Sequence, residues 1–272
     1  MINDTAIVFI VFDGYEDLWD DAIRLIELYW PLHPPIYVFT NTITHNWPGI
    51  KCIPVGDKAE WSMKAQAAVD TVVEQYLILM LEDFYVGAAV DNRKIEGLIG
   101  FMKSRNIEYC RLCDNNRIVP KLLPKYESGY PYEVIFEDQK YGINLQASVW
   151  KKSFLKQIVG KENYNAWVFE VNQTKKARTA EHVPFKRCIS SPGNILHIKH
   201  GALQGKMLPP TVKYFAKIGH PLSTKRQVMD KYSYTRFIIK HLGKDLTPAF
   251  AVKWVKNLAR KFGYTFLDEK WS

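Results

Sequence analysis

Residues 76–83 read Tyr-Leu-Ile-Leu-Met-Leu-Glu-Asp, an apolar run that ends on two adjacent carboxylates. A run of this length, with Gly87 soon after it, is typical of a strand buried on both faces of a parallel sheet. In open α/β sheets, ligands collect at the carboxyl ends of such strands. Glu82 and Asp83 are therefore well placed to hold a divalent cation against a phosphate group. The alternative is that they form an ordinary cap or a loop ion pair.

On both sides of this run, strand and helix patterns alternate as far as about residue 115. This alternation predicts an α/β fold, a three-layer sandwich around a mostly parallel central sheet. Pro54 favours an edge or end position for the strand that contains it. Apolar runs predict strands at 5–12, 36–39, 50–55, 76–81 and 109–113, and helical spacing predicts helices at 15–30, 61–75 and 92–106.

The pattern changes after residue 115. We expect one domain over residues 1–218 and a helical C-terminal extension over residues 219–272. The later predicted strands lie at 132–136 and 195–199, and the later predicted helices lie at 149–159, 164–178, 209–218, 225–242 and 247–263.

The charge of the chain is concentrated in its tail. The formal net charge is +9, and 13 of the 37 Lys and Arg residues but only 4 of the 28 Asp and Glu residues lie in the last 60 positions. The rest of the chain holds 24 residues of each sign, so it is neutral overall. Such asymmetry points to an anionic partner for the tail.

The last predicted helix is amphipathic, with Thr247 as N-cap, Pro248 in the first turn and Gly263 as C-cap. Basic helices of this kind lie on anionic membrane surfaces. A nucleic-acid backbone is an alternative partner, but the chain has no known nucleic-acid motif, so we expect no nucleic-acid binding. The third possibility is that the two tail helices are solvated or form an oligomer contact. Its apolar face carries Ala251, Val255, Leu258 and Phe262, and its basic face carries Lys253, Lys256, Arg260 and Lys261.

Several features favour a cytoplasmic protein that associates peripherally with the inner face of the cell membrane. The sequence contains no run of about 18 apolar residues, so we expect no membrane-spanning helix. The first residues lack the pattern of a signal peptide. Cys110 and Cys113 form a CxxC motif without a second ligand pair. We interpret them as buried thiols, with a zinc or redox role as the alternative.

Four segments follow one another in this order along the chain: Tyr-Leu-Ile-Leu-Met-Leu-Glu-Asp-Phe (76–84), Asn-Leu-Gln-Ala-Ser-Val-Trp (144–150), Trp-Val-Phe-Glu (167–170) and His-Gly-Ala-Leu-Gln-Gly-Lys (200–206). Together they resemble the bacterial surface-polysaccharide glycosyltransferases of capsule or O-antigen type, which have the GT-A fold. The resemblance covers roughly residues 5–218. It implies a metal-dependent, inverting transfer of a sugar from a nucleoside-diphosphate donor, with a UDP-sugar favoured, to a hydroxyl of a lipid-linked glycan. The alternative is a non-catalytic, membrane-associated protein that binds a nucleotide or glycan.

By this resemblance, Glu82 and Asp83 stand where the family has an Asp-x-Asp motif and would bind Mn²⁺ or Mg²⁺. The two acids are adjacent here, and no second Asp lies two residues away. The resemblance also implies that His200 is a further metal ligand and that Lys206 meets the diphosphate. Both residues have the alternative of being ordinary loop residues.

Glu170 is the candidate catalytic base. It follows the apolar Trp-Val-Phe stretch, and burial raises a carboxyl pKa and favours proton acceptance near neutral pH. In the resembling family, an acidic residue at this place accepts the proton of the acceptor hydroxyl. The alternative is a solvated glutamate on an amphipathic helix, with Trp167 and Phe169 in the core.

The resemblance also assigns residues to the two substrates. Asp13 would accept a hydrogen bond from the base or a ribose hydroxyl, and Trp150 would stack on a sugar ring. The alternatives are a turn residue for Asp13, a helix cap for Ser62 and a core position for Trp150. The expected nucleotide-sugar side comprises Phe12, Asp13, Asn41, Trp61, Ser62 and Lys206, and the expected acceptor or sugar side comprises Gln146 and Trp150.

Overall fold

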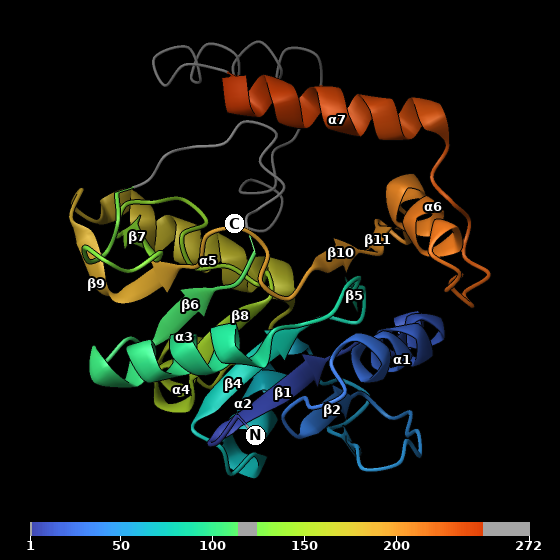
Figure 1. The fold of residues 1–272 in the computed structure, drawn as a ribbon, viewed down its shortest axis with the longest axis horizontal. Coiled ribbons are helices and arrows are strands. Elements are labelled where there is room, and N and C mark those ends of the chain that lie inside the picture. Colours follow the sequence, from blue (N-terminus) through green and yellow to red (C-terminus); the bar gives the residue numbers. More distant parts are fainter. Residues whose placement is uncertain (1, 114–123, 247–272) are drawn as a thin grey trace.

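The protein folds around one large sheet with helices on both of its faces (Figure 1). The structure, a computed structural model, describes residues 2–113 and 124–246, with only the backbone for residues 240–246. The predicted helix 247–263 lies outside the described residues.

Six of the eight strands of the main sheet run in the same direction, while β8 and β7 run against them. This confirms the predicted fold class, and the strand containing Pro54 lies at the edge, as predicted. The strand order is β3 (Lys51–Pro54), β2 (Ile36–Thr40), β1 (Thr5–Ile10), β4 (Tyr76–Met80), β8 (Ser148–Lys151), β6 (Tyr109–Arg111), β9 (Pro184–Ser190), β7 (Glu133–Phe136).

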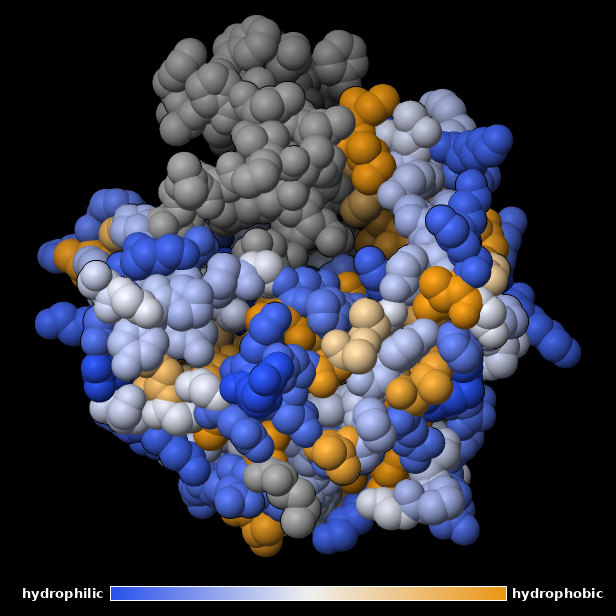
Figure 2. All heavy atoms as spheres, viewed as in Figure 1, coloured by the Kyte–Doolittle hydropathy of each residue, from blue (hydrophilic) through white to orange (hydrophobic). Residues whose placement is uncertain are grey.

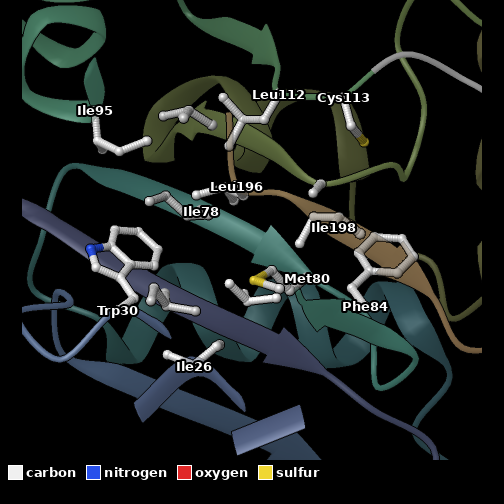
Figure 3. Packing of buried hydrophobic residues seen from close by; sticks show 14 of the residues in the cluster. Ile26, Trp30, Ile78, Met80, Phe84, Ile95, Leu112, Cys113, Leu196 and Ile198 are labelled. Atoms are coloured by element: carbon white, nitrogen blue, oxygen red, sulfur yellow. The ribbon is translucent and has the colours of Figure 1, made fainter. Parts of the chain in front are cut away.

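Two hydrophobic cores fill the spaces between the layers, because strand residues alternate in direction. Ile7 and Phe9 of β1 pack in one core, and Val8 packs in the other. Figure 3 shows part of the first core, in which Ile78 of β4 lies close to Leu196. The first core contains residues of α1 (Trp19–Tyr29) and α3 (Asn92–Ser104); the second contains residues of α2 (Trp61–Thr71), α4 (Lys152–Val159) and α5 (Ala166–Thr179).

Further elements lie outside the main sheet, and four short strands among them form two separate two-stranded sheets. The two residues at the turn of the β11–β12 hairpin, Gln204 and Gly205, have φ values of 51° and 79°, the left-handed conformations that tight hairpin turns require. These elements are η1 (Asp13–Leu18), β5 (Phe84–Val86), β10 (Ile198–His200), β11 (Ala202–Leu203), β12 (Lys206–Met207), α6 (Pro209–Lys217) and α7 (Lys231–Leu246).

Two sequence predictions fail in the second half of the chain. Residues 148–151 form the central strand β8, not the start of a helix, and α4 begins only at Lys152. Strand β9 was not predicted, because Pro184 and two basic residues interrupt its apolar pattern. Both strands are fixed by their neighbours in the sheet, so local pattern is a weak guide to them.

The tail helix also starts later than predicted. Residues 219–230 form no helix, and α7 begins at Lys231. Arg226 forms an ion pair with Asp17 at 2.7 Å, and the backbone N–H of Ser223 donates to Asp21 Oδ2 at 2.6 Å. These contacts hold the segment against the first helical elements. The domain boundary at residue 218 stays a prediction.

On the face shown in Figure 2, hydrophilic side chains predominate and hydrophobic ones are interspersed among them. Within residues 2–113 and 124–246, no helix is both long enough and apolar enough to cross a membrane.

The packing of β8 can be tested with Trp150→Ala. Trp150 is 0% exposed and its ring contacts Tyr109 and Phe154. Its removal should lower the free energy of unfolding by about 3–5 kcal/mol, because a large cavity remains. Urea denaturation measures this. The control is Val73→Ala at a position that is 75% exposed, where we expect a change within about 0.5 kcal/mol. Equal losses in both variants would contradict the core assignment.

Candidate functional site

A cavity of about 620 Å³ lies at the carboxyl ends of β1 and β4. Its lining comes from the β1–η1 link, the start of α2, the β4–β5 link, the start of α5 and the β10–β11 segment. Ligand pockets of α/β sheets form at this edge. Eight of the predicted site residues line it: Phe12, Asn41, Trp61, Glu82, Asp83, Gln146, Glu170 and His200.

The pairing of β5 with β10 brings His200 to the same cavity as Glu82 and Asp83. His200 lies opposite Phe84 in the register, and the two rings meet edge to face at 5.0 Å between centroids. The next residue, Gly201, donates its N–H to the Asp83 carbonyl at 2.7 Å. A Cβ on Gly201 would lie 2.5 Å from the Tyr85 ring, so only glycine permits this approach.

The three predicted metal ligands have shifted pKa values. Burial, together with the neighbouring Asp83 charge, raises the pKa of Glu82 to about 8, although Lys64 and Arg226 act in the opposite direction. Burial raises the pKa of Asp83 to about 6, despite the hydrogen bond that its carboxylate accepts from the Ala202 N–H at 3.2 Å. Burial lowers the pKa of His200 to about 4, so its imidazole is neutral at pH 7.

These residues fit a cation site that a substrate completes. Among the residues that the structure describes, no three His, Cys, Asp or Glu side chains gather closely enough to hold a metal ion. Glu82, Asp83 and His200 line one cavity but do not form a complete ligand cluster. Mg²⁺ is usually bound by one or two carboxylates together with substrate phosphates. Two neighbouring carboxylates whose pKa values are raised are the kind of group that a cation would stabilise in the ionised form.

Glu170 projects into the cavity from a firmly anchored helix. The Asn165 side chain caps α5 by accepting the Val168 N–H at 3.1 Å. Phe169, which is fully buried, packs on Trp61 at 4.8 Å between ring centroids. Glu170 Oε1 accepts the Leu145 N–H at 3.1 Å, which orients the carboxylate.

Lys64 is a site residue that the sequence prediction missed. It is 3% exposed, and its Nζ donates to the Val11 carbonyl at 2.6 Å and to Asn41 Oδ1 at 2.9 Å. Burial lowers its pKa, although the Glu82 charge acts to raise it. The sequence did contain a signal, because Lys64 falls on the face of α2 that also carries Trp61 and Ala65.

Two predicted nucleotide contacts shape the loops beside the cavity. Asp13 does not line the cavity, because its carboxylate accepts the N–H groups of Asn41, Thr42 and Ile43 at 2.8–3.0 Å. Partial burial acts to raise its pKa, but these bonds outweigh it and lower the pKa. Asn41 lines the cavity, but its amide N–H groups donate to loop carbonyls, the shortest bond being to Ala59 at 2.7 Å. For Asp13 the turn role, which was the alternative, describes the structure better.

Two further predictions require correction. Ser62 is fully buried, and its hydroxyl donates to the Glu162 carbonyl at 2.7 Å. Trp150 is also fully buried, and its Nε1 donates to Ser148 Oγ at 2.8 Å. Neither can touch a nucleotide or a sugar in this arrangement. Lys206 lies in β12, outside the residues that line the cavity, and its contact with a diphosphate stays a prediction.

Comparisons with known proteins give only distant likenesses. Neither a protein-family model nor a curated protein matches the sequence. The chain is similar to Staphylococcus aureus TarS 1–349 at 8% identity and a TM-score of 0.45, covering 70% of this chain and 58% of that one. A comparison with a longer TarS structure gives a TM-score of 0.46, and this chain spans 43% of the TarS chain.

A mannosyltransferase of Pyrobaculum calidifontis, PcManGT, solved in complex with GDP-Man and Mn²⁺, is similar at 8% identity and a TM-score of 0.44. That match covers 96% of this chain and 81% of the other. Likenesses this weak establish nothing about the activity of this chain.

The raised pKa of Glu82 predicts a pH-dependent stability for the metal-free protein. Between its ordinary value of 4.5 and the folded value of about 8, the folded state binds more protons than the unfolded state. The free energy of unfolding therefore falls as pH rises through this window, by at most about 1.4 kcal/mol per pH unit. Glu82→Gln should remove this loss, so its advantage over wild type should grow from pH 5 to pH 8.

Urea denaturation at both pH values, without divalent ions, measures this advantage. Glu96→Gln, an exposed position on α3, is the control and should show no such trend. A difference between Glu82→Gln and wild type that stays constant from pH 5 to pH 8 would show that Glu82 is not a perturbed group.

Proposed function

We propose that the protein is a metal-dependent glycosyltransferase that moves a sugar from a nucleoside-diphosphate donor to a hydroxyl of a glycan acceptor. The observation that carries this proposal is the gathering of Glu82, Asp83 and Glu170 around one cavity from distant parts of the chain. Glu82 and Asp83 are suited to bind a cation together with a diphosphate, and Glu170 is suited to accept a proton. The resemblance of the sequence to surface-polysaccharide enzymes of the GT-A fold supports the same reading.

The donor would occupy the side of the cavity formed by β1 and α2. Phe12 is 55% exposed and lines the cavity at the end of β1, where its ring can stack on a nucleobase. Lys64 holds the Val11 carbonyl and the Asn41 side chain in place, which keeps this wall fixed. We favour a UDP-sugar as the donor.

Glu82 and Asp83, with the neutral imidazole of His200, would hold Mn²⁺ or Mg²⁺. The bound cation would offset the negative charge that develops on the departing diphosphate. The Ala202 N–H donates to Asp83 Oδ2, which fixes the orientation of this carboxylate before substrate arrives.

Glu170 would act as the general base. It takes the proton of the acceptor hydroxyl, and the oxygen forms a bond to the anomeric carbon of the donor sugar. The bond from that carbon to the diphosphate breaks, and the nucleoside diphosphate leaves with the electron pair. A single displacement of this kind inverts the anomeric configuration. General-base assistance contributes roughly 10²- to 10⁴-fold to such rates.

We also propose that the basic tail binds the anionic inner face of the cell membrane, where a lipid-linked acceptor would lie. The last 60 residues carry the whole net charge of the chain. On α7, Tyr232 is 75% exposed and Ile239 is 62% exposed, and apolar side chains of this kind enter the headgroup region.

The catalytic proposal is tested with full-length Asp83→Ala and Glu170→Gln. Wild type should bind UDP in the presence of Mn²⁺ by isothermal titration, and Asp83→Ala should weaken this binding at least about 10-fold, the effect of 1.4 kcal/mol. Glu170→Gln should keep UDP affinity but lose transfer and donor hydrolysis by about 10²-fold or more, since the amide cannot accept the proton.

Glu96→Gln serves as the matched control with unchanged binding and turnover. GDP and CMP are titrated as well before an absence of UDP binding is interpreted. Nucleotide binding without turnover of any donor would favour the non-catalytic alternative. Unchanged donor turnover in both site variants would refute the assignments of Asp83 and Glu170.

The membrane proposal is tested by co-sedimentation with lipid vesicles. Wild type should bind vesicles with 30% phosphatidylglycerol and release them in 0.5 M NaCl, because salt screens surface attraction. Pure phosphatidylcholine vesicles are the control. Replacing Lys253, Lys256, Arg260 and Lys261 by Gln should reduce binding several-fold. Equal binding of wild type to neutral and anionic vesicles would contradict an electrostatic anchor.

A further inference from the structure

Trp167 is a large apolar side chain that the fold leaves open to the cavity. It is 48% exposed and lies in the first turn of α5, whereas Trp150 is 0% exposed. Single exposed hydrophobic residues are common on protein surfaces, so exposure alone carries no meaning. The location does, because Trp167 lines the same cavity as Glu170.

Trp167 and Glu170 lie on the same side of α5. Residues three apart in a helix are neighbours, with about 5–6 Å between their Cβ atoms. Phe169 points the other way and packs on Trp61 and Trp150, with ring centroids 4.8 and 6.2 Å apart. This buried ring fixes the rotation of the helix, so the indole and the carboxylate both face the cavity.

The start of α5 is held without help from the indole. The Asn165 cap and the hydrogen bond from the Leu145 N–H to Glu170 anchor this turn. Trp167 is thus presented on a rigid element, and a ligand that uses it loses little free energy in ordering the protein.

The neighbours of Trp167 define the chemistry of its ligand. Asn165, Gln146 and Glu170 line the same cavity as Trp167. A ligand that lies on the indole would also meet these polar side chains, so it needs hydroxyl groups as well as an apolar face. A pyranose ring has both, because its C–H bonds can lie on the electron-rich indole face while its hydroxyls stay free. A lipid chain has an apolar surface but no hydroxyl groups to place beside these polar side chains.

A nucleobase is the competing ligand for an exposed aromatic ring. Among the described aromatic residues of the lining, Phe12 at 55% exposure and Trp167 at 48% are the most exposed. Phe12 belongs to the β1 end beside Lys64, whose Nζ lies 5.9 Å from its ring centroid. Trp167 lies on the same helix as Glu170, the candidate base. A ligand bound on the indole would therefore be the acceptor, whose hydroxyl gives its proton to Glu170.

We propose that Trp167 is the acceptor platform: its indole stacks on the terminal pyranose of a glycan acceptor and presents a hydroxyl of that sugar to Glu170. This rests on the proposed function. It adds to that function the residue that binds and orients the sugar of the glycan acceptor.

The test measures sugar binding apart from catalysis. Full-length protein is loaded with UDP and Mn²⁺, and methyl glycosides of glucose, galactose and mannose are titrated by saturation-transfer NMR. Wild type should transfer saturation to the C–H protons of at least one glycoside. Trp167→Ala should weaken that binding about 5-fold or more, as expected for the loss of about 1 kcal/mol of stacking, and Trp167→Phe should retain most of it.

Two controls accompany these variants. Tyr130→Ala removes an aromatic ring that is 41% exposed outside the cavity lining, and it should leave glycoside binding unchanged. Isothermal titration of UDP should give affinities within about 2-fold of wild type for all three variants. Thermal unfolding verifies that each variant is folded.

The outcomes separate the two proposals. If wild type binds none of UDP, GDP and CMP, the proposed function itself fails and the platform fails with it. If UDP binds but no glycoside binds, or if Trp167→Ala binds glycosides as wild type does, only the platform is refuted. Loss of UDP affinity in Trp167→Ala with glycoside binding intact would place the nucleobase on Trp167 and refute the platform as well.

Discussion

The antiparallel pairing of β5 with β10 holds the candidate site together. It joins segments more than 110 residues apart, with His200 opposite Phe84 and the Gly201 N–H bonded to the Asp83 carbonyl. The approach depends on a residue without a side chain at position 201, since the Tyr85 ring occupies the space of a Cβ. Both the orientation of Asp83 and the position of the imidazole follow from this one pairing.

A second network fixes the part of the cavity wall at the end of β1. The buried Lys64 bonds the end of β1 and the Asn41 side chain, and Asn41 in turn bonds the loop before α2. Asp13 gathers the backbone N–H groups that follow β2. These hydrogen bonds hold the backbone of this wall in place. The pKa values of Glu82 and Asp83 are raised, and a bound cation would favour the ionised form of both carboxylates.

The local pattern of the sequence was sufficient for the first half of the fold. The apolar run of β4 and the amphipathic α1, α2 and α3 are each specified within a short window, and the structure places them close to the predicted ranges. β8 and β9 were not predicted as strands, because each is stabilised by its partners across the sheet and not by its own alternation. Trp150 is the clearest example: its sequence context fits a sugar platform or a core residue equally well, and only its burial decides.

The sequence by itself determined the α/β class, the carboxylates at the end of β4 and the basic tail, because periodicity, composition and charge are local properties of a chain. Glu170, which the sequence pointed to as a catalytic base, lines the cavity, and its role as a base stays a prediction. Tertiary structure alone decided which polar groups remain available to a ligand. Asp13 and Ser62 are occupied by backbone partners, while Trp167 is left open beside Glu170. That distinction depends on contacts between segments distant in the chain, which spacing along the sequence does not encode.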